Sequence, residues 1–199
     1  MSHFNELTPT RVGNAGQAGR PTGQDGRSGI GHSAGALDDR EAQVLDAGTI
    51  DHIKRLGLLT GWRCAAIGAG GASVARWLAA RIRQPGHVVA ADADTRALDR
   101  LACEGLEIRK HDIMTGPLDF ESYDFVHSRL LLTRLPDRVR AVKNMVASLR
   151  PGAWLLAEDY DMGTAGLELA GLKTIQVDAR RIDSRLMVAA WGQKPAPFI

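Results

Sequence analysis

A short glycine-rich run and two single acids have the types and spacing needed to bind a nucleotide-like ligand. Gly68-Ala69-Gly70-Gly71 directly follows the apolar run 64–67. Glycine can adopt positive φ, and without a Cβ it lets the backbone come close to a ligand. Asp92 stands about twenty residues further on, where an acid can accept both ribose hydroxyls of an adenosine ligand. A second acid, Asp112, follows the next apolar segment and is expected at the same edge of a sheet.

The surrounding pattern predicts the elements that hold these residues in place. Buried strands are expected at 64–67, 87–91 and 106–110, and an amphipathic helix at 72–80. Strand, glycine turn and helix form the opening of a nucleotide-binding βαβ unit, and the helix start offers free N–H groups. A glycine turn also serves tight strand-to-helix packing, and Asp94 or Thr95 is expected to cap a helix after the second strand.

The rest of the chain predicts a helix near residues 37–59, with Thr49 as its N-cap and Gly57 as its stop. A fourth strand is expected at 123–126, followed by His127, and a fifth at 153–157. Glu158 and Asp159 are expected to cap the turn after the fifth strand. A short helix is expected at 167–171. The segments 172–179 and 184–191 are predicted to form an antiparallel pair with a turn at 180–183.

Six blocks in this order resemble the class I S-adenosylmethionine-dependent methyltransferases, in particular bacterial small-molecule methyltransferases: 61–73, 88–101, 106–112, 123–137, 149–161 and 185–195. The resemblance implies a Rossmann-like doubly wound α/β sheet of about seven strands, mostly parallel, with an antiparallel C-terminal strand. It implies S-adenosylmethionine as cofactor and a small molecule as methyl acceptor. The cofactor-binding residues that it implies are Gly68, Ala69, Gly70, Asp92, Ala93, Asp112, Ile113 and His127.

Each of these positions has an implied role. The glycine turn surrounds the methionine and ribose parts of the cofactor, Asp92 binds the ribose, and Asp112 contacts the adenine amino group, with Ile113 packed on the ring. His127 follows the fourth strand, where the family lines the cofactor pocket. His127, Glu158, Asp159 and Asp161 lie near the active edge, but the sequence assigns none of them as a catalytic base.

Two differences from the family pattern leave alternatives open. Ala66 stands where the family usually carries an acid that helps hold the methionine end, and Ala72 stands where relatives tend to have glycine. Ala72 fits if that residue has helical backbone angles. The segment after the fifth strand is also short, so the substrate pocket is expected to be open, or completed by a homodimer or a partner chain.

The first alternative is a methyltransferase-like protein without methyl transfer, such as a cyclase, a cofactor-binding protein or a partner subunit. A remote second is an NAD(P)-dependent oxidoreductase. That alternative is disfavoured because Ser73 occupies the position of the third fingerprint glycine.

Composition sets the remaining limits. Residues 1–36 are rich in glycine and polar residues and predict a disordered tail before a methyltransferase-like domain at 37–199. The net charge of +2 gives no strong basic field for nucleic acid. With no run of 18 apolar residues and no signal segment, a cytoplasmic protein without membrane contact is expected. Cys64 and Cys103 are expected to be buried free thiols, and no metal site is expected.

Overall fold

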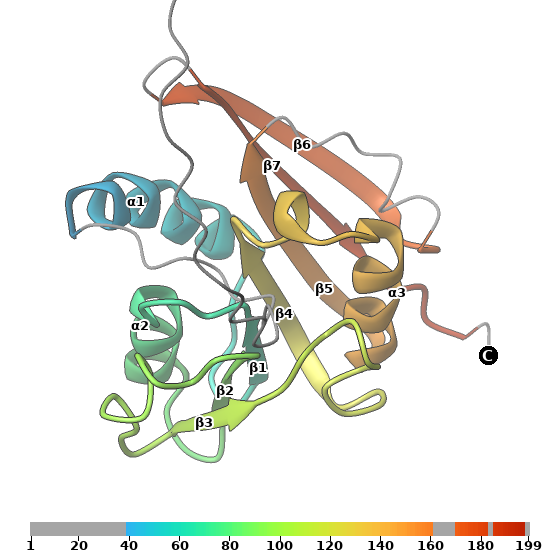
Figure 1. The fold of residues 1–199 in the computed structure, drawn as a ribbon. Coiled ribbons are helices and arrows are strands. Elements are labelled where there is room, and N and C mark those ends of the chain that lie inside the picture. Colours follow the sequence, from blue (N-terminus) through green and yellow to red (C-terminus); the bar gives the residue numbers. More distant parts are fainter. Residues whose placement is uncertain (1–38, 161–169, 183–184, 198–199) are drawn as a thin grey trace, which may run out of the picture. The chain divides into compact units, whose positions relative to one another are not determined.

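A mostly parallel sheet forms the centre of the structure (Figure 1). The computed structural model describes residues 39–160, 170–182 and 185–197. Within these ranges, seven strands form one sheet in the order β3-β2-β1-β4-β5-β7-β6. The five parallel strands are β1 (Arg63–Ile67), β2 (His87–Asp92), β3 (Leu106–Lys110), β4 (Tyr123–Arg129) and β5 (Leu149–Tyr160). The strand β7 (Arg185–Gln193) lies between β5 and β6 (Lys173–Ile182) and runs antiparallel to both. The predicted fold class is confirmed.

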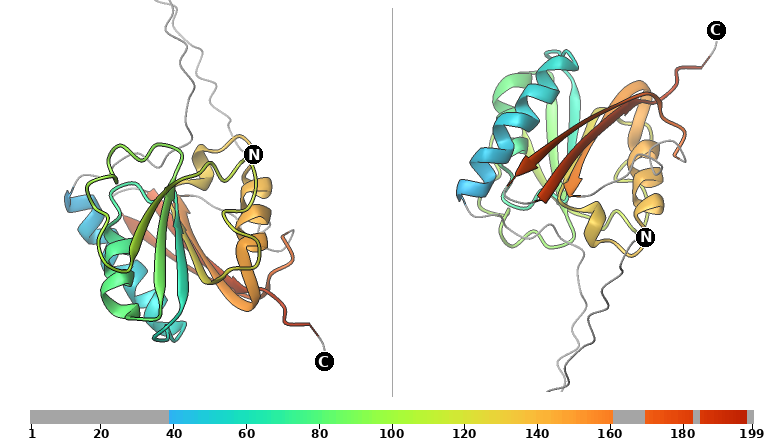
Figure 2. Two further views of the ribbon diagram at one scale, coloured as in Figure 1. Left: turned by 90° about the horizontal axis from the view of Figure 1, so that it is seen from below. Right: turned by 90° about the horizontal axis from the view of Figure 1, so that it is seen from above.

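Helices cover both faces of this sheet (Figure 2). The helices α1 (Asp39–Arg55) and α2 (Ser73–Ile82) lie on one face, and α3 (Arg138–Ser148) lies on the other. Successive side chains of a strand point to opposite faces. Ala66 therefore packs in the cluster that contains Leu78 of α2, whereas Ala65 packs in the cluster that contains Met145 of α3. The core is thus divided into two layers by the sheet.

The helix α1 differs from its prediction. It spans Asp39–Arg55, so Thr49 lies inside the helix and does not cap it. The Thr49 hydroxyl lies 3.1 Å from the carbonyl oxygen of Leu45 and 2.5 Å from Oε2 of Glu158. A buried threonine in a helix satisfies its hydroxyl in this way, which local sequence pattern does not distinguish from a cap. The predicted tail at 1–36 and most of the predicted helix at 167–171 lie outside the described residues.

The connection between β2 and β3 also differs from its prediction. Residues 96–100 form turns, not the helix expected after Asp94 or Thr95. The Asp94 carboxylate instead pairs with the guanidinium and backbone N–H of Arg96. Cys103, which was expected to be buried, is exposed, while Cys64 is buried as predicted, and both are free thiols.

The central strands extend further than the sequence predicted. His127 lies inside β4, and Glu158 and Asp159 lie inside β5, with 2 % and 0 % of their surfaces exposed. The turn that both acids were expected to cap lies beyond Tyr160, outside the described residues. Asp159 accepts hydrogen bonds from the backbone N–H and the hydroxyl of Thr133 in the short 3-10 helix Leu132–Arg134. The turn predicted at 180–183 is wrong for its first residues, because β6 continues to Ile182.

Candidate functional site

The glycine turn between β1 and α2 is tied to the end of β2. The backbone N–H groups of Gly68 and Ala69 donate to the carbonyl oxygen of Ala91 at 2.8 and 3.2 Å. Gly68 has φ +67°, and a Cβ on it would lie 2.8 Å from Cδ2 of Leu131. Glycine is therefore required at position 68 both by its backbone conformation and by close packing. The turn places the start of α2 beside the carboxyl end of β2.

Ala72 has left-handed backbone angles, φ 56° and ψ 17°, at the N-cap of α2. The condition under which alanine fits the family pattern, a helical backbone, is therefore not met. Its N–H donates to the carbonyl oxygen of Ala69 at 2.8 Å, which closes the turn. Left-handed angles cost a residue with a Cβ about 1 kcal/mol or more. Ala72 is thus a strained residue next to the candidate cofactor turn.

Asp92 joins the glycine turn to the end of β2. Its Oδ2 accepts the N–H of Gly70 at 3.2 Å, and its Oδ1 accepts the N–H of Asp94 at 3.1 Å. The residue is only 2 % exposed. Burial raises the pKa of Asp92, and the hydrogen bonds from Asp94, Gly70 and Ala93 oppose this effect. The structure thus brings together Gly68, Ala69, Gly70, Asp92 and Ala93, as the sequence predicted.

Asp112 and Ile113 follow the next strand, β3. Oδ1 of Asp112 accepts the N–H of Met114 at 2.9 Å, so the acid shapes the turn after β3. Ile113 is buried at 3 % exposure, and its carbonyl oxygen accepts Nδ2 of Asn144 at 2.6 Å. Their contacts with an adenine ring stay a prediction.

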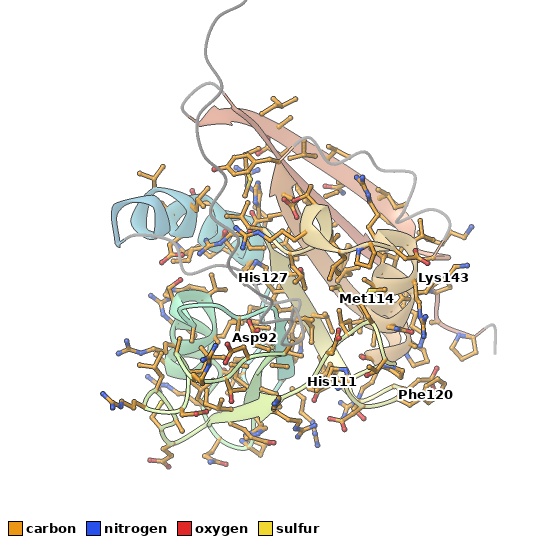
Figure 3. All side chains as sticks on the ribbon, viewed as in Figure 1. Asp92, His111, Met114, Phe120, His127 and Lys143 are labelled. Atoms are coloured by element: carbon orange, nitrogen blue, oxygen red, sulfur yellow. The ribbon has the colours of Figure 1, made fainter. Side chains whose placement is uncertain are left out.

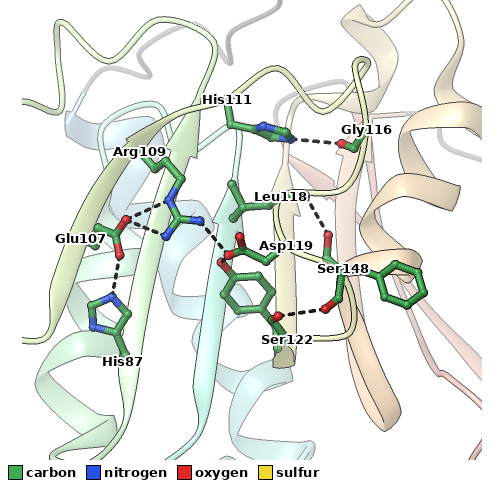
Figure 4. Close-up of polar contacts among 11 residues, drawn as sticks. His87, Glu107, Arg109, His111, Gly116, Leu118, Asp119, Ser122 and Ser148 are labelled. Carbon is green, nitrogen blue, oxygen red and sulfur yellow. Dashed lines mark hydrogen bonds and ion pairs between the residues drawn. The ribbon is translucent and has the colours of Figure 1, made fainter.

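A separate polar network lies on edge strand β3 (Figure 4). The guanidinium of Arg109 donates to Glu107 and to Asp119, each at 2.7 Å. Glu107 also contacts Nε2 of His87 at 3.0 Å, and the Tyr123 hydroxyl donates to Asp119 at 2.5 Å. These groups pair with one another, so the network serves to hold the edge strand and the segment before β4.

The side chain of His127 pairs with Glu158 and not with the glycine turn. The residue is paired in register with Ala66 on the neighbouring strand, and its side chain is buried. Figure 3 shows Asp92 close to α2 and His127 closer to α1. Nε2 of His127 lies 3.2 Å from Oε2 of Glu158. The structure therefore assigns His127 to a second group of residues, and its contact with a cofactor stays a prediction.

That second group, which we call the histidine–carboxylate cluster, consists of Thr49, His52, His127, Glu158 and Asp178. Nδ1 of His52 lies 3.0 Å from Oε1 of Glu158, and Nε2 of His52 lies 3.0 Å from Oδ2 of Asp178. The cluster joins α1 to β4, β5 and β6. Sequence reasoning missed it, although polar residues three apart on the inner side of an amphipathic helix were a usable signal.

Glu158 is the centre of the cluster and carries a strongly shifted pKa. Burial raises the pKa of a carboxyl group. Hydrogen bonds from His127, His52 and Thr49 outweigh that effect and lower the pKa of Glu158 to about 2. Glu158 is therefore an ionised carboxylate, surrounded by donors from two elements.

One buried hydroxyl at the strand ends has no partner. Among the described residues, Oγ of Ser128 and Nε of Arg63 are the buried side-chain polar atoms without a hydrogen bond. Ser128 is paired in register with Ile67 on one side and Ala157 on the other. It therefore lies next to the residue that precedes the glycine turn. A buried hydroxyl without a partner costs free energy.

Two kinds of feature are absent from the residues that the structure describes. No group of three or more His, Cys, Asp or Glu side chains in those ranges is arranged to hold a metal ion. No helix in the same ranges has the length and apolar character needed to cross a membrane.

Comparison with known proteins adds to this geometry. The family model of the methyltransferase domain matches residues 65–157. Methyltransferase str2 of Strobilurus tenacellus is 40 % identical to this chain over 60 residues. That match covers 29 % of this chain and 22 % of the Strobilurus protein, so the chain spans much less than the length of this relative.

Solved structures share the fold. The Haemonchus contortus phosphoethanolamine N-methyltransferase 2 bound to phosphomonomethylethanolamine and S-adenosylhomocysteine matches with a TM-score of 0.64 and 16 % identity, over 75 % of this chain and 52 % of that one. The [4+2]-cyclase SpnF matches with a TM-score of 0.64 and 15 % identity, over 86 % of this chain and 89 % of that one. A chain from the Haloferax volcanii complex with the Trm112 methyltransferase activator matches with a TM-score of 0.65 and 16 % identity, over 81 % of this chain and 94 % of that one. At these identities the likeness concerns the fold.

The matched segment begins in β1 and ends in β5, so it contains the glycine turn, Asp92, Asp112 and His127. The strands outside it include the antiparallel C-terminal strand that the resemblance implied, since β7 lies antiparallel beside β5. Residues 65–157 thus match a methyltransferase domain, and the whole sheet has the fold of solved S-adenosylmethionine-dependent methyltransferases.

Proposed function

We propose that this protein is an S-adenosylmethionine-dependent methyltransferase that acts on a small-molecule acceptor. The observation that carries the proposal is the hydrogen bond from Gly70 to the carboxylate of Asp92. It joins the glycine turn to the end of β2 at the carboxyl edge of a parallel sheet. Ligands of open α/β sheets bind at this edge.

The residues at this edge fit S-adenosylmethionine. Asp92 offers carboxylate oxygens to ribose hydroxyls, and the turn has room beside it, because a Cβ on Gly71 would meet no atom within 4 Å. Asp112 and Ile113 would hold the adenine, with Gly68, Ala69 and Gly70 around the methionine and ribose parts.

When bound, this cofactor supplies an electrophilic methyl group for in-line transfer to a nucleophile. The contribution of the protein is to orient the reacting groups and exclude water. We assign no catalytic base. The ring of His127 is engaged by Glu158, and the carboxylate of Asp159 is engaged by Thr133, so their observed contacts are structural.

The acceptor class rests on charge and on chain length. The net charge of +2 provides little attraction for nucleic acid, which favours a small molecule. Few residues separate β5 from β6 in the sequence, so we propose an open pocket that a second copy or a partner chain completes. The Haloferax volcanii complex with the Trm112 activator is an example of a partner bound to a protein of this fold.

A second candidate function is a reaction other than methyl transfer. Ala66 favours it, because this buried residue leaves the end of β1 without the acid expected at the methionine end of the cofactor. The likeness to the cyclase SpnF shows that this fold occurs in an enzyme named for another reaction.

The test is calorimetric binding of S-adenosylmethionine and S-adenosylhomocysteine, with NADH as the control ligand. We expect dissociation constants on the order of micromolar for the wild type and loss of binding in Asp92→Ala. Asp94→Ala is the matched control, since the Asp94 side chain pairs with Arg96 at the surface. This variant should bind like the wild type.

Three outcomes separate the candidates. Binding that depends on Asp92, followed by methyl transfer in a substrate screen, supports the main proposal. Binding of the same strength without transfer to any acceptor supports the second candidate. No binding at millimolar cofactor shows that the turn has only a structural role.

A further inference from the structure

The inner side of α1 is polar where it meets the rest of the domain. Asp46, Thr49 and His52 follow one another at intervals of three residues, so they lie on one side of the helix. Thr49 and His52 are 1 % and 3 % exposed. Buried polar groups are costly unless they are paired. The position of α1 therefore depends on the partners that these side chains meet.

Those partners connect α1 to the candidate cofactor turn. Oδ1 of Asp46 accepts the hydroxyl of Ser73 at 2.9 Å and Nη2 of Arg129 at 2.7 Å. Nη1 of Arg129 also donates to the hydroxyl of Thr49 at 3.1 Å. Ser73 is the first residue of α2 and directly follows the turn that ends at Ala72. A shift of α1 would therefore release the first turn of α2.

The geometry around His52 identifies its protonation state. Both of its ring nitrogens lie 3.0 Å from a carboxylate oxygen, one of Glu158 and one of Asp178. An ionised carboxylate only accepts hydrogen bonds, and a neutral imidazole has a single N–H. Only the imidazolium can donate to both oxygens at once. The Trp191 ring, 5.0 Å away between centroids, packs against it and supplies no charge.

The charges around this ring favour the same state. Among the described residues, the charged or titratable groups that face the interface of α1 with the sheet include Glu158 of β5, Asp178 of β6, His127 and Arg129 of β4, and Asp46 of α1 itself. Three of these are carboxylates and one is a guanidinium. The hydrogen bond to Glu158 raises the pKa of His52, against the opposing effect of burial.

We propose that His52 is a positioning residue for the cofactor site. As an imidazolium shared by Glu158 and Asp178, it holds α1 on the sheet, and α1 holds the first turn of α2 through Asp46. The role at the cofactor site rests on the function proposed above. Cofactor affinity should therefore fall as the pH rises through the titration of His52.

The experiment uses the full chain, its His52→Gln variant and His87→Gln as a matched control. His87 makes a similar contact, with Nε2 3.0 Å from a carboxylate oxygen of Glu107, but it lies near the surface away from α1. Glutamine at position 52 cannot carry the charge. Three quantities are measured from about pH 6 to about pH 9: the NMR shifts of the histidine ring nitrogens, hydrogen exchange of the α1 amides without ligand, and the dissociation constant of S-adenosylhomocysteine.

We expect a protonated His52 ring at the acid end of this range. In the wild type and in His87→Gln, α1 exchange should rise beyond the intrinsic effect of pH, and the dissociation constant should increase about fivefold or more. In His52→Gln, exchange should be fast and binding weak at every pH. The ring-nitrogen titration needs only the wild type, so it tests the proposal even if His52→Gln does not fold.

The outcomes distinguish this inference from the proposed function. A neutral His52 ring near pH 6, or equal α1 exchange in wild type and His52→Gln, overturns the inference. Equal ligand binding by both proteins at all pH values also overturns it and leaves the cofactor function intact. Binding by neither protein, with α1 exchange that still follows His52, overturns the cofactor function and the role of His52 at that site.

Discussion

Substitution of Gly68 by alanine should cost more stability than the same substitution at Gly105 or Gly71. The φ of +67° at Gly68 would hold the alanine in the left-handed backbone region, which costs a residue with a Cβ about 1–2 kcal/mol. The added Cβ would also lie 2.8 Å from Cδ2 and 3.0 Å from Cδ1 of Leu131. Such overpacking in a core costs about 1–3 kcal/mol. The two effects together predict a loss of about 2–5 kcal/mol in the free energy of unfolding.

Two other glycines separate these effects. Gly105 has φ +80° but open space around it, so Gly105→Ala should show the conformational cost alone, about 1–2 kcal/mol. Gly71 has open space and no positive φ, so Gly71→Ala should change stability by less than about 0.5 kcal/mol. Urea unfolding followed by circular dichroism, with equal m-values, measures all three.

A double-mutant cycle with Leu131→Ala isolates the steric part. This change removes the three side-chain atoms nearest to the added Cβ. In that background, Gly68→Ala should cost only what Gly105→Ala costs. If Gly68→Ala and Gly105→Ala are equally destabilising in the wild-type background, the contact with Leu131 contributes nothing and the reasoning is wrong.

Three further predictions follow from the site. The low pKa of Glu158, about 2 against an ordinary 4.5, gives stability that is fully present above about pH 4.5 and is lost as the pH falls towards 2. Glu158→Gln should lower the free energy of unfolding by about 3–5 kcal/mol. Urea titrations at several pH values should also show a weaker loss of stability at acid pH in this variant, and an unchanged loss would contradict the role of Glu158. Ala66→Glu should tighten the binding of S-adenosylhomocysteine by about 1–3 kcal/mol in calorimetry. Ala66→Gln should not tighten it, and equal affinities of the two variants would refute an effect of charge. Exposed Cys103 should react with a thiol reagent in the native protein, while Cys64, whose pKa burial raises, should react only after unfolding. Cys103→Ser should remove the fast reaction of the native protein. A fast reaction that persists in this variant would show that Cys64 is accessible.

Local pattern was sufficient for the parts of the fold that depend on neighbours in sequence. The runs that became β1, β2 and β3 are short, apolar and bounded by turn residues, so their positions were predicted closely. The meeting of Asp92 with the glycine turn follows from the parallel pairing of β1 and β2, which a βαβ unit imposes.

The parts that were missed depend on contacts between distant segments. Thr49 and His52 meet Glu158 across 109 and 106 residues, and the spacing of the polar residues on α1 indicates a buried polar side but not which distant residue is the partner. The same contact explains why Thr49 was mistaken for a helix cap, since threonine suits both places. Ala72 shows another limit, because its left-handed angles follow from the geometry of the whole turn.

The place of β7 in the sheet has a consequence for the order in which the domain can be completed during synthesis. The strand β6 leaves the ribosome first, yet its pairing partner is β7, which follows it in the chain. Until β7 has inserted beside β5, β6 cannot join the sheet, and Asp178 cannot be held near His52. The pairing of β6 with β7 is itself local, since Ile182 pairs with Arg185, so the two strands can join the sheet as one hairpin. The outer edge of the sheet and the contact of Asp178 with His52 can thus be completed only once β7 has been synthesised.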